Sequence, residues 1–149
     1  MQIYRLCKTE FAKDLTGTGA KLYGGRWNKI NTPCIYAASS RALAVLEFSV
    51  NVNELLIPDN LSMVTLEIEQ KSVKEILFKN LPKDWKQCPF SAATQDLGTY
   101  LLEKGARILK VPSAVIEQEY NFILNPLVAP PAFKLVEITD YPYDRRIKK

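Results

Sequence analysis

An acid inside an apolar run, and an arginine beside two glycines, are the residues with the clearest chemical potential. The segment "GGRWNKINTPCIYAASSRALAVLEFS" places Arg26 directly after Gly24 and Gly25, and it embeds Glu47 among apolar side chains. Arginine stays charged and binds phosphates through paired hydrogen bonds, and glycine lets the backbone approach a ligand closely. A buried carboxylate is costly unless it is paired or hydrogen-bonded. Glu47 therefore either reaches a solvent gap or forms a structural ion pair, with Arg26 as its natural counterpart, or it points into a polar cleft and takes part in catalysis.

Three further residues are candidates for the same site. Tyr36 lies just before the apolar run, as a core aromatic or as a ring that stacks on a flat ligand. Ser113 follows Pro112 at a bend, as a turn serine or as a hydroxyl offered to a ligand. A buried asparagine needs hydrogen-bond partners, so Asn121 is expected to brace a loop near a site rather than to react.

The composition excludes several classes of chemistry. The chain has no histidine, which excludes Ser-His-Asp and Cys-His catalysis and every histidine-ligated metal site. Its cysteines, Cys7, Cys34 and Cys88, are far apart and lack CxxC spacing, so we predict neither a disulfide framework nor a metal site. The net charge is only +4, and the basic residues are scattered except in the tail "DRRIKK", which we interpret as solvated. We expect no direct nucleic-acid binding.

The length and the hydropathy pattern favour one cytoplasmic domain. The 149 residues suit a single domain with a real core, over residues 1–149. The opening "MQIYRLCKTEF" does not resemble a signal peptide. No apolar run approaches the roughly 20 residues that a membrane span needs. We therefore expect a cytoplasmic protein without membrane contact.

Strand and helix patterns alternate irregularly along the chain. Period-two or short apolar patterns predict strands. Helices are predicted at 39–50, with Ser39 or Ser40 as N-cap, and at 94–105, with Gly105 as C-terminal cap. The glycine-rich stretch 16–27 is typical of a loop that leads into a short strand, and 72–78 of a short helix or turn. The expected strands lie at 2–6, 33–38, 63–69, 107–116 with a break at Pro112, 119–126 and 133–138. This order lacks regular βαβ repeats and predicts an α+β domain with a bent or split mixed sheet flanked by helices.

Taken together, these motifs resemble the RES domain family, the toxin half of a bacterial toxin–antitoxin system. The family is named after an arginine, a glutamate and a serine, which match Arg26 in "LYGGRWN", Glu47 in "SSRALAVLEFS" and Ser113 in "VPSAVI". Tyr36 in "TPCIYAA" matches the family's tyrosine, and "YNFILNP" and "YDRRI" also fit. The family often has a histidine shortly after "NP", whereas this chain reads "NPLVAPP".

The resemblance implies an ADP-ribosyltransferase-like fold and an enzyme that consumes NAD by hydrolysis or phosphorolysis. Transfer of ADP-ribose to a protein, and a catalytically inactive antitoxin-binding module, are the alternatives. It implies NAD as substrate, phosphate as a candidate co-substrate and no prosthetic group or metal. The implied partner is an Xre-like antitoxin that covers the site, and a homodimer within that complex is compatible with it. The expected catalytic residues are Arg26, Tyr36, Glu47 and Ser113, and Gly25, Trp27 and Asn121 join Arg26, Tyr36 and Ser113 as substrate-binding residues.

Overall fold

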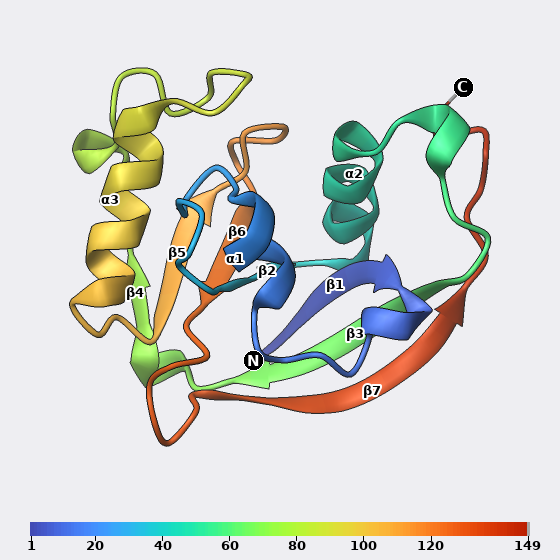
Figure 1. Cartoon of the computed structure of the whole chain (residues 1–149), viewed down its shortest axis with the longest axis horizontal. Helices are drawn as coiled ribbons and strands as arrows, with labels where there is room; N and C mark the ends of the chain where they lie inside the picture. Colours follow the sequence, from blue (N-terminus) through green and yellow to red (C-terminus); the bar gives the residue numbers. More distant parts are fainter. Residues whose placement is uncertain (149) are drawn as a thin grey trace.

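One mixed β-sheet forms the frame of the computed structural model, which describes residues 1–148 (Figure 1). The strand order is β4-β5-β6-β2-β1-β3-β7, and all neighbours are antiparallel except β4 and β5. The strands are β1 (Gln2–Lys8), β2 (Ile35–Ala38), β3 (Leu61–Ile68), β4 (Val73–Glu75), β5 (Ile108–Pro112), β6 (Tyr120–Leu124) and β7 (Phe133–Tyr141). The helices are α1 (Thr18–Tyr23), α2 (Arg41–Asn51) and α3 (Ala92–Glu103), with short 3-10 turns η1 (Thr9–Phe11), η2 (Glu54–Leu56), η3 (Gln70–Ser72) and η4 (Phe78–Asn80).

The sheet is split between β2 and β1. These two strands share a single paired position, Tyr4 with Ala38, whereas β1 and β3 pair along seven positions. Helix α3 lies over the half formed by β4, β5, β6 and β2, and α2 lies beside the junction (Figure 1). The α+β architecture with a split mixed sheet is therefore confirmed, and a cavity lined by residues of both β1 and β2 lies at the split.

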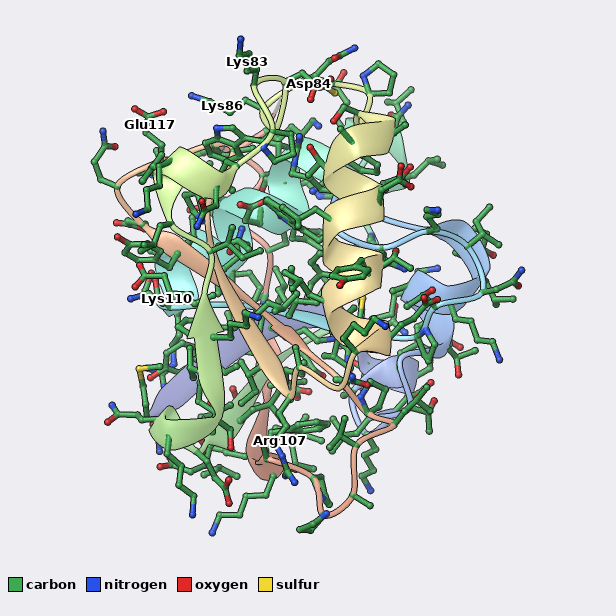
Figure 2. All side chains as sticks on the ribbon, turned by 90° about the vertical axis from the view of Figure 1, so that its left-hand side faces the viewer. Lys83, Asp84, Lys86, Arg107, Lys110 and Glu117 are labelled. Atoms are coloured by element: carbon green, nitrogen blue, oxygen red, sulfur yellow. The ribbon has the colours of Figure 1, made fainter. Side chains whose placement is uncertain are left out.

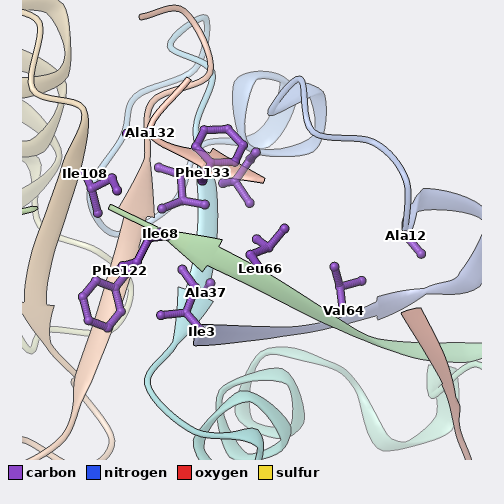
Figure 3. Close-up of a cluster of buried hydrophobic side chains, with 12 residues drawn as sticks. Ile3, Ala12, Ala37, Val64, Leu66, Ile68, Ile108, Phe122, Ala132 and Phe133 are labelled. Carbon is purple, nitrogen blue, oxygen red and sulfur yellow. The ribbon is translucent and has the colours of Figure 1, made fainter. Parts of the chain in front are cut away.

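Side chains from β1, β2, β3 and β6 build a core cluster that holds the two halves together. Ile3, Ala37, Val64, Leu66 and Phe122 pack there and are almost fully buried (Figure 3). Val64 and Leu66 are two residues apart in β3, as the period-two pattern predicted. Burial of these side chains removes apolar surface from water, which is the main favourable contribution to folding.

Two local predictions were wrong. Residues 18–23 form helix α1 rather than a loop leading into a strand, bounded by Gly17 and Gly24, which have φ of +73° and +71°. The expected short strand is reduced to one bridge between Gly25 and Asn28. Residues 73–75 form strand β4 rather than a helix or turn, because they pair with β5, a partner that local propensity does not reveal.

The helix that carries Glu47 is confirmed. Ser40 caps α2 by accepting a hydrogen bond from the Leu43 N–H at 3.0 Å. Leu43, Ala44, Val45 and Ser49 are buried, whereas Val50 is 50% exposed and lines the cleft. The middle of α2 is therefore buried as predicted, and the cleft exposes the helix at Val50.

The basic tail is bound to α2 rather than fully solvated. Lys148 donates to the backbone oxygens of Ser49 and Val52 at the C-terminal end of the helix. Such a cation satisfies helix carbonyls that lack an intrahelical partner. The Tyr143 hydroxyl hydrogen-bonds the Ser49 hydroxyl at 2.7 Å. The C-terminal tail thus holds α2 in place at the end opposite its N-cap.

Candidate active site

The Glu47 carboxylate is held by two neutral donors from neighbouring strands. The Ser113 hydroxyl, just after β5, donates to Oε1 at 2.7 Å, and the Asn121 side-chain amide, in β6, donates to the same oxygen at 2.6 Å. Within residues 1–148, Oε2 makes no hydrogen bond and Glu47 forms no ion pair. The hypothesis that Arg26 is the ion-pair partner of Glu47 was therefore wrong. Both partners are neutral, so within residues 1–148 no ion pair offsets the negative charge of Glu47.

The hydrogen bonds that the Ser113 oxygen accepts leave its hydroxyl hydrogen free to be donated to Glu47 alone. Its side-chain oxygen accepts from the backbone N–H groups of Val115 and Ile116, both at 3.1 Å. A serine hydroxyl has two acceptor positions and one hydrogen. Two backbone donors occupy the acceptor positions, so the hydrogen is left for Glu47. Ser113 is fully buried, and in this structure it orients the carboxylate rather than facing the open cleft.

Arg26 has one tethered edge and one free edge. Its Nη1 donates to the backbone oxygens of Trp85 at 2.7 Å and Gln87 at 2.9 Å, and the guanidinium carbon lies 5.2 Å from the centre of the Phe90 ring. The Nε and Nη2 groups make no hydrogen bond with residues 1–148. Arginine binds an oxyanion bidentately through such an edge. The guanidinium is thus held in place while the donors that an anion needs remain available.

Tyr36 holds the loop that carries Arg26 in place through two hydrogen bonds. Its hydroxyl accepts from the Trp27 N–H at 2.9 Å and donates to the Asn28 side-chain oxygen at 2.7 Å. Asn28 is fully buried and donates in turn to the backbone oxygens of Ala20 and Thr32. Burial raises the pKa of Tyr36 well above its ordinary value, so the hydroxyl keeps the proton that it donates to Asn28.

Helix α3 fixes the same loop from the other side. The Gln95 side chain donates to the Gly25 backbone oxygen at 3.0 Å. Gly98 lets the helix approach so closely that an added Cβ would lie 1.9 Å from the Trp27 backbone oxygen. Sequence reasoning missed Asn28, Gln95 and Gly98. The signal for Gly98 was present, because an isolated glycine inside a helical pattern usually has a packing reason.

These groups meet in a cleft of about 520 Å³. Six of the seven expected site residues line it, and Ser113 lies beneath it as the partner of Glu47. The six are Gly25, Arg26, Trp27, Tyr36, Glu47 and Asn121. A second cavity of about 420 Å³ adjoins it and shares Tyr36, Glu47, Asn51 and Asn121. Glu47 therefore lines both cavities.

Two other kinds of feature bear on function. Among residues 1–148, no three Cys, Asp or Glu side chains are arranged so that they could hold a metal ion. None of the described helices has the length and the hydrophobicity that crossing a bilayer demands.

The protein is an α+β domain with a split mixed sheet, and one cleft holds both the Glu47 carboxylate and the free guanidinium edge of Arg26. The chain superposes with a TM-score of 0.79 on a structure described as the crystal structure of the M. tuberculosis MbcT-MbcA toxin-antitoxin complex. The match covers 95% of this chain and 84% of that chain at 18% identity, which shows a shared fold. The RES domain model matches residues 2–146, so the chain belongs to the RES domain family.

Proteins of related sequence have names that refer to toxins. A protein named Toxin Res from Photorhabdus laumondii is 37% identical over 129 residues, covering 85% of this chain and 83% of that protein. Toxin Res from Yersinia enterocolitica is 36% identical, covering 85% of this chain and 84% of that protein. A protein named Prs ADP-ribosylating toxin, from Sphingobium sp., is 37% identical, covering 80% of this chain and 76% of that protein.

Proposed function

We propose that this chain is the toxin of a bacterial toxin–antitoxin pair and that it degrades NAD by cleaving the nicotinamide–ribose bond. The observation that carries the proposal is the Glu47 carboxylate, oriented by Ser113 and Asn121 so that one oxygen is free in the cleft. The toxin names of the related proteins support the biological role.

The chemistry of NAD cleavage matches a site without histidine. The bond between the ribose carbon and the ring nitrogen breaks, and its electron pair neutralises the positively charged ring, so no strong general acid is needed. The ribose carbon gains positive charge in the transition state, as in glycoside hydrolysis. A fixed carboxylate beside that carbon stabilises the charge most where water is excluded. Glu47 would supply this interaction through its free oxygen.

The remaining groups hold the substrate and the loop. The free edge of Arg26 would bind the pyrophosphate, whose two negative charges suit a bidentate donor. Tyr36 and Asn28 would keep the arginine loop in place through their hydrogen bonds. A water or phosphate oxygen then forms the new bond to the ribose carbon, and in hydrolysis the water proton passes to solvent. NAD is the substrate in this proposal, and the reaction requires no prosthetic group.

The name of one related protein supports a protein side chain as an alternative acceptor of ADP-ribose. The protein named Prs ADP-ribosylating toxin is 37% identical over 123 residues. Transfer of ADP-ribose to a protein shares the first bond-breaking step and differs only in the nucleophile. Glu47 and Arg26 would have the same roles in both reactions, so the acceptor must be settled by analysis of the products.

The proposed partner is an Xre-like antitoxin that covers the cleft, with a homodimer of the toxin compatible with the complex. The shared fold with a protein solved in a toxin–antitoxin complex supports such a partner. A free guanidinium edge at the cleft would accept an acidic or carboxylate-ended antitoxin segment. The toxin would act in the cytoplasm, where NAD is available.

The test combines expression with product analysis. Expression without a partner should stop growth and lower cellular NAD. Purified protein incubated with NAD should release nicotinamide, and the second product with and without phosphate distinguishes hydrolysis from phosphorolysis. Growth arrest at normal NAD would point to protein modification, and normal growth with intact NAD would leave the inactive antitoxin-binding module.

A further inference from the structure

Phe90 presents an aromatic ring to the cleft that holds Arg26. It lies directly before Ser91, the N-cap of α3, it lines the cleft, and 39% of it is exposed. An apolar residue before an N-cap often packs against the residue five positions later. That residue is Gln95, whose side chain instead donates to the backbone of the arginine loop. Phe90 therefore lacks the usual apolar partner in α3, and it lines the cleft, where the Arg26 guanidinium lies over its ring.

The segment that carries this ring is anchored on both sides. Trp85 is 8% exposed and packs in the core, and its backbone oxygen accepts from Arg26. Ser91 caps α3 by accepting from the Thr94 N–H. On the outer surface, Lys86 forms an ion pair with Glu117 at 3.1 Å, and Figure 2 shows both at the same end of the molecule. The ring is thus supported on a fixed segment, which lowers the entropy cost of binding a ligand against it.

We propose that Phe90 is the stacking platform for the adenine ring of the dinucleotide. This inference rests on the proposed NAD substrate and assigns a place in the cleft to the adenine half of NAD. Base–aromatic stacking needs only an accessible ring face. The Arg26 guanidinium lies over one face of the Phe90 ring, and the 39% exposure of this residue leaves ring surface in the cleft for a base.

Electrostatics selects adenine over nicotinamide at this position. The Arg26 guanidinium lies 5.2 Å from the Phe90 ring centre. Bound nicotinamide carries a positive charge, so placing it here would bring two cations together. Adenine is neutral and stacks well on aromatic rings and on guanidinium planes. The cationic ring is better placed near Glu47, which forms no ion pair with residues 1–148. The two charged residues thus orient the dinucleotide along the cleft.

The test compares Phe90→Leu with Phe11→Leu, a control on the exposed turn η1 outside the Arg26 cleft. Leucine keeps apolar bulk but removes the ring face. Affinity for ADP-ribose and for AMP should fall roughly tenfold to a hundredfold in Phe90→Leu, the range that loss of base stacking gives. The KM for NAD should rise by a similar factor while kcat stays near that of the parent. Nicotinamide mononucleotide, which lacks adenine, should react alike with parent and variant.

The outcomes separate this inference from the proposed reaction. Unchanged affinity for ADP-ribose in Phe90→Leu, or no binding of ADP-ribose by the parent, would overturn adenine stacking. Equal loss with NAD and with nicotinamide mononucleotide would also overturn it, because Phe90 would then act by placing Arg26. If the parent binds ADP-ribose through Phe90 but does not cleave NAD, the stacking site stands and the proposed reaction fails. If NAD is cleaved and Phe90→Leu binds like the parent, the reaction stands and the stacking site fails.

Discussion

Replacement of Glu47 by glutamine separates a catalytic charge from a structural one. The amide keeps the size of the carboxylate, and its oxygen can still accept from Ser113 and Asn121, which donate to one carboxylate oxygen at 2.7 and 2.6 Å. The substitution therefore removes the charge and leaves the hydrogen-bond pattern possible. Because Glu47 forms no ion pair within residues 1–148, no cation is left buried and unpaired by the change.

The expected cost in stability is small. A hydrogen bond to a charged group contributes about 1.5–3 kcal/mol, and a neutral one about 0.5–1.5 kcal/mol. Glu47 is partly exposed, so solvent already screens its charge. Two weakened bonds then lower the free energy of unfolding by about 1–2 kcal/mol. For a chain of this length, that corresponds to a fall of roughly 2–8 °C in the thermal midpoint.

The expected cost in turnover is much larger. Loss of one preorganised electrostatic group typically lowers kcat by about a hundredfold to a thousandfold. NAD affinity should fall far less than kcat, because the interaction with Glu47 is strongest when the ribose carbon gains charge in the transition state. The thermal midpoint, NAD affinity and nicotinamide release should be measured on the same preparation. Glu103→Gln, on an exposed residue at the end of α3, is the control for the loss of one acid. A Glu47→Gln protein that releases nicotinamide at the parent rate would refute the catalytic assignment.

Two other predictions concern the loop and the core beneath it. Gly98→Ala should lower the free energy of unfolding by about 1–3 kcal/mol and weaken NAD binding, because the added Cβ would meet the Trp27 backbone oxygen at 1.9 Å. Chemical denaturation and NAD titration check this prediction. Parent-like values in both measurements would contradict it. Burial raises the pKa of the Cys34 thiol from 9.0 to about 12, so the folded state holds this proton more tightly and its contribution to stability is lost as pH rises from about 9 through 12. Denaturant midpoints measured across that range should fall more steeply for the parent than for Cys34→Ala, and parallel curves would refute the assignment.

The regular elements could be predicted because their signals are local. The helix at 39–50 has a serine N-cap followed by apolar residues, and both features act within one or two turns. The strand at 63–69 was visible as alternation, since Val64 and Leu66 face one cluster. Strand β4 and helix α1 were missed because a distant pairing with β5 and two positive-φ glycines decide them. The single pair between β1 and β2 that splits the sheet is likewise a property of the assembled strands.

For the candidate site, the sequence by itself determined which residues are available for chemistry. The absence of histidine, the acid at position 47 and the arginine after two glycines limited the possible reactions before any fold was known. Only the tertiary structure decided which groups meet. Glu47 contacts Ser113 and Asn121, which are 66 and 74 positions away, and Arg26 is tied to Trp85, 59 positions away. Such pairings depend on where the split sheet brings β5, β6 and α2 together, and a contact of that separation leaves no periodic trace in a single sequence.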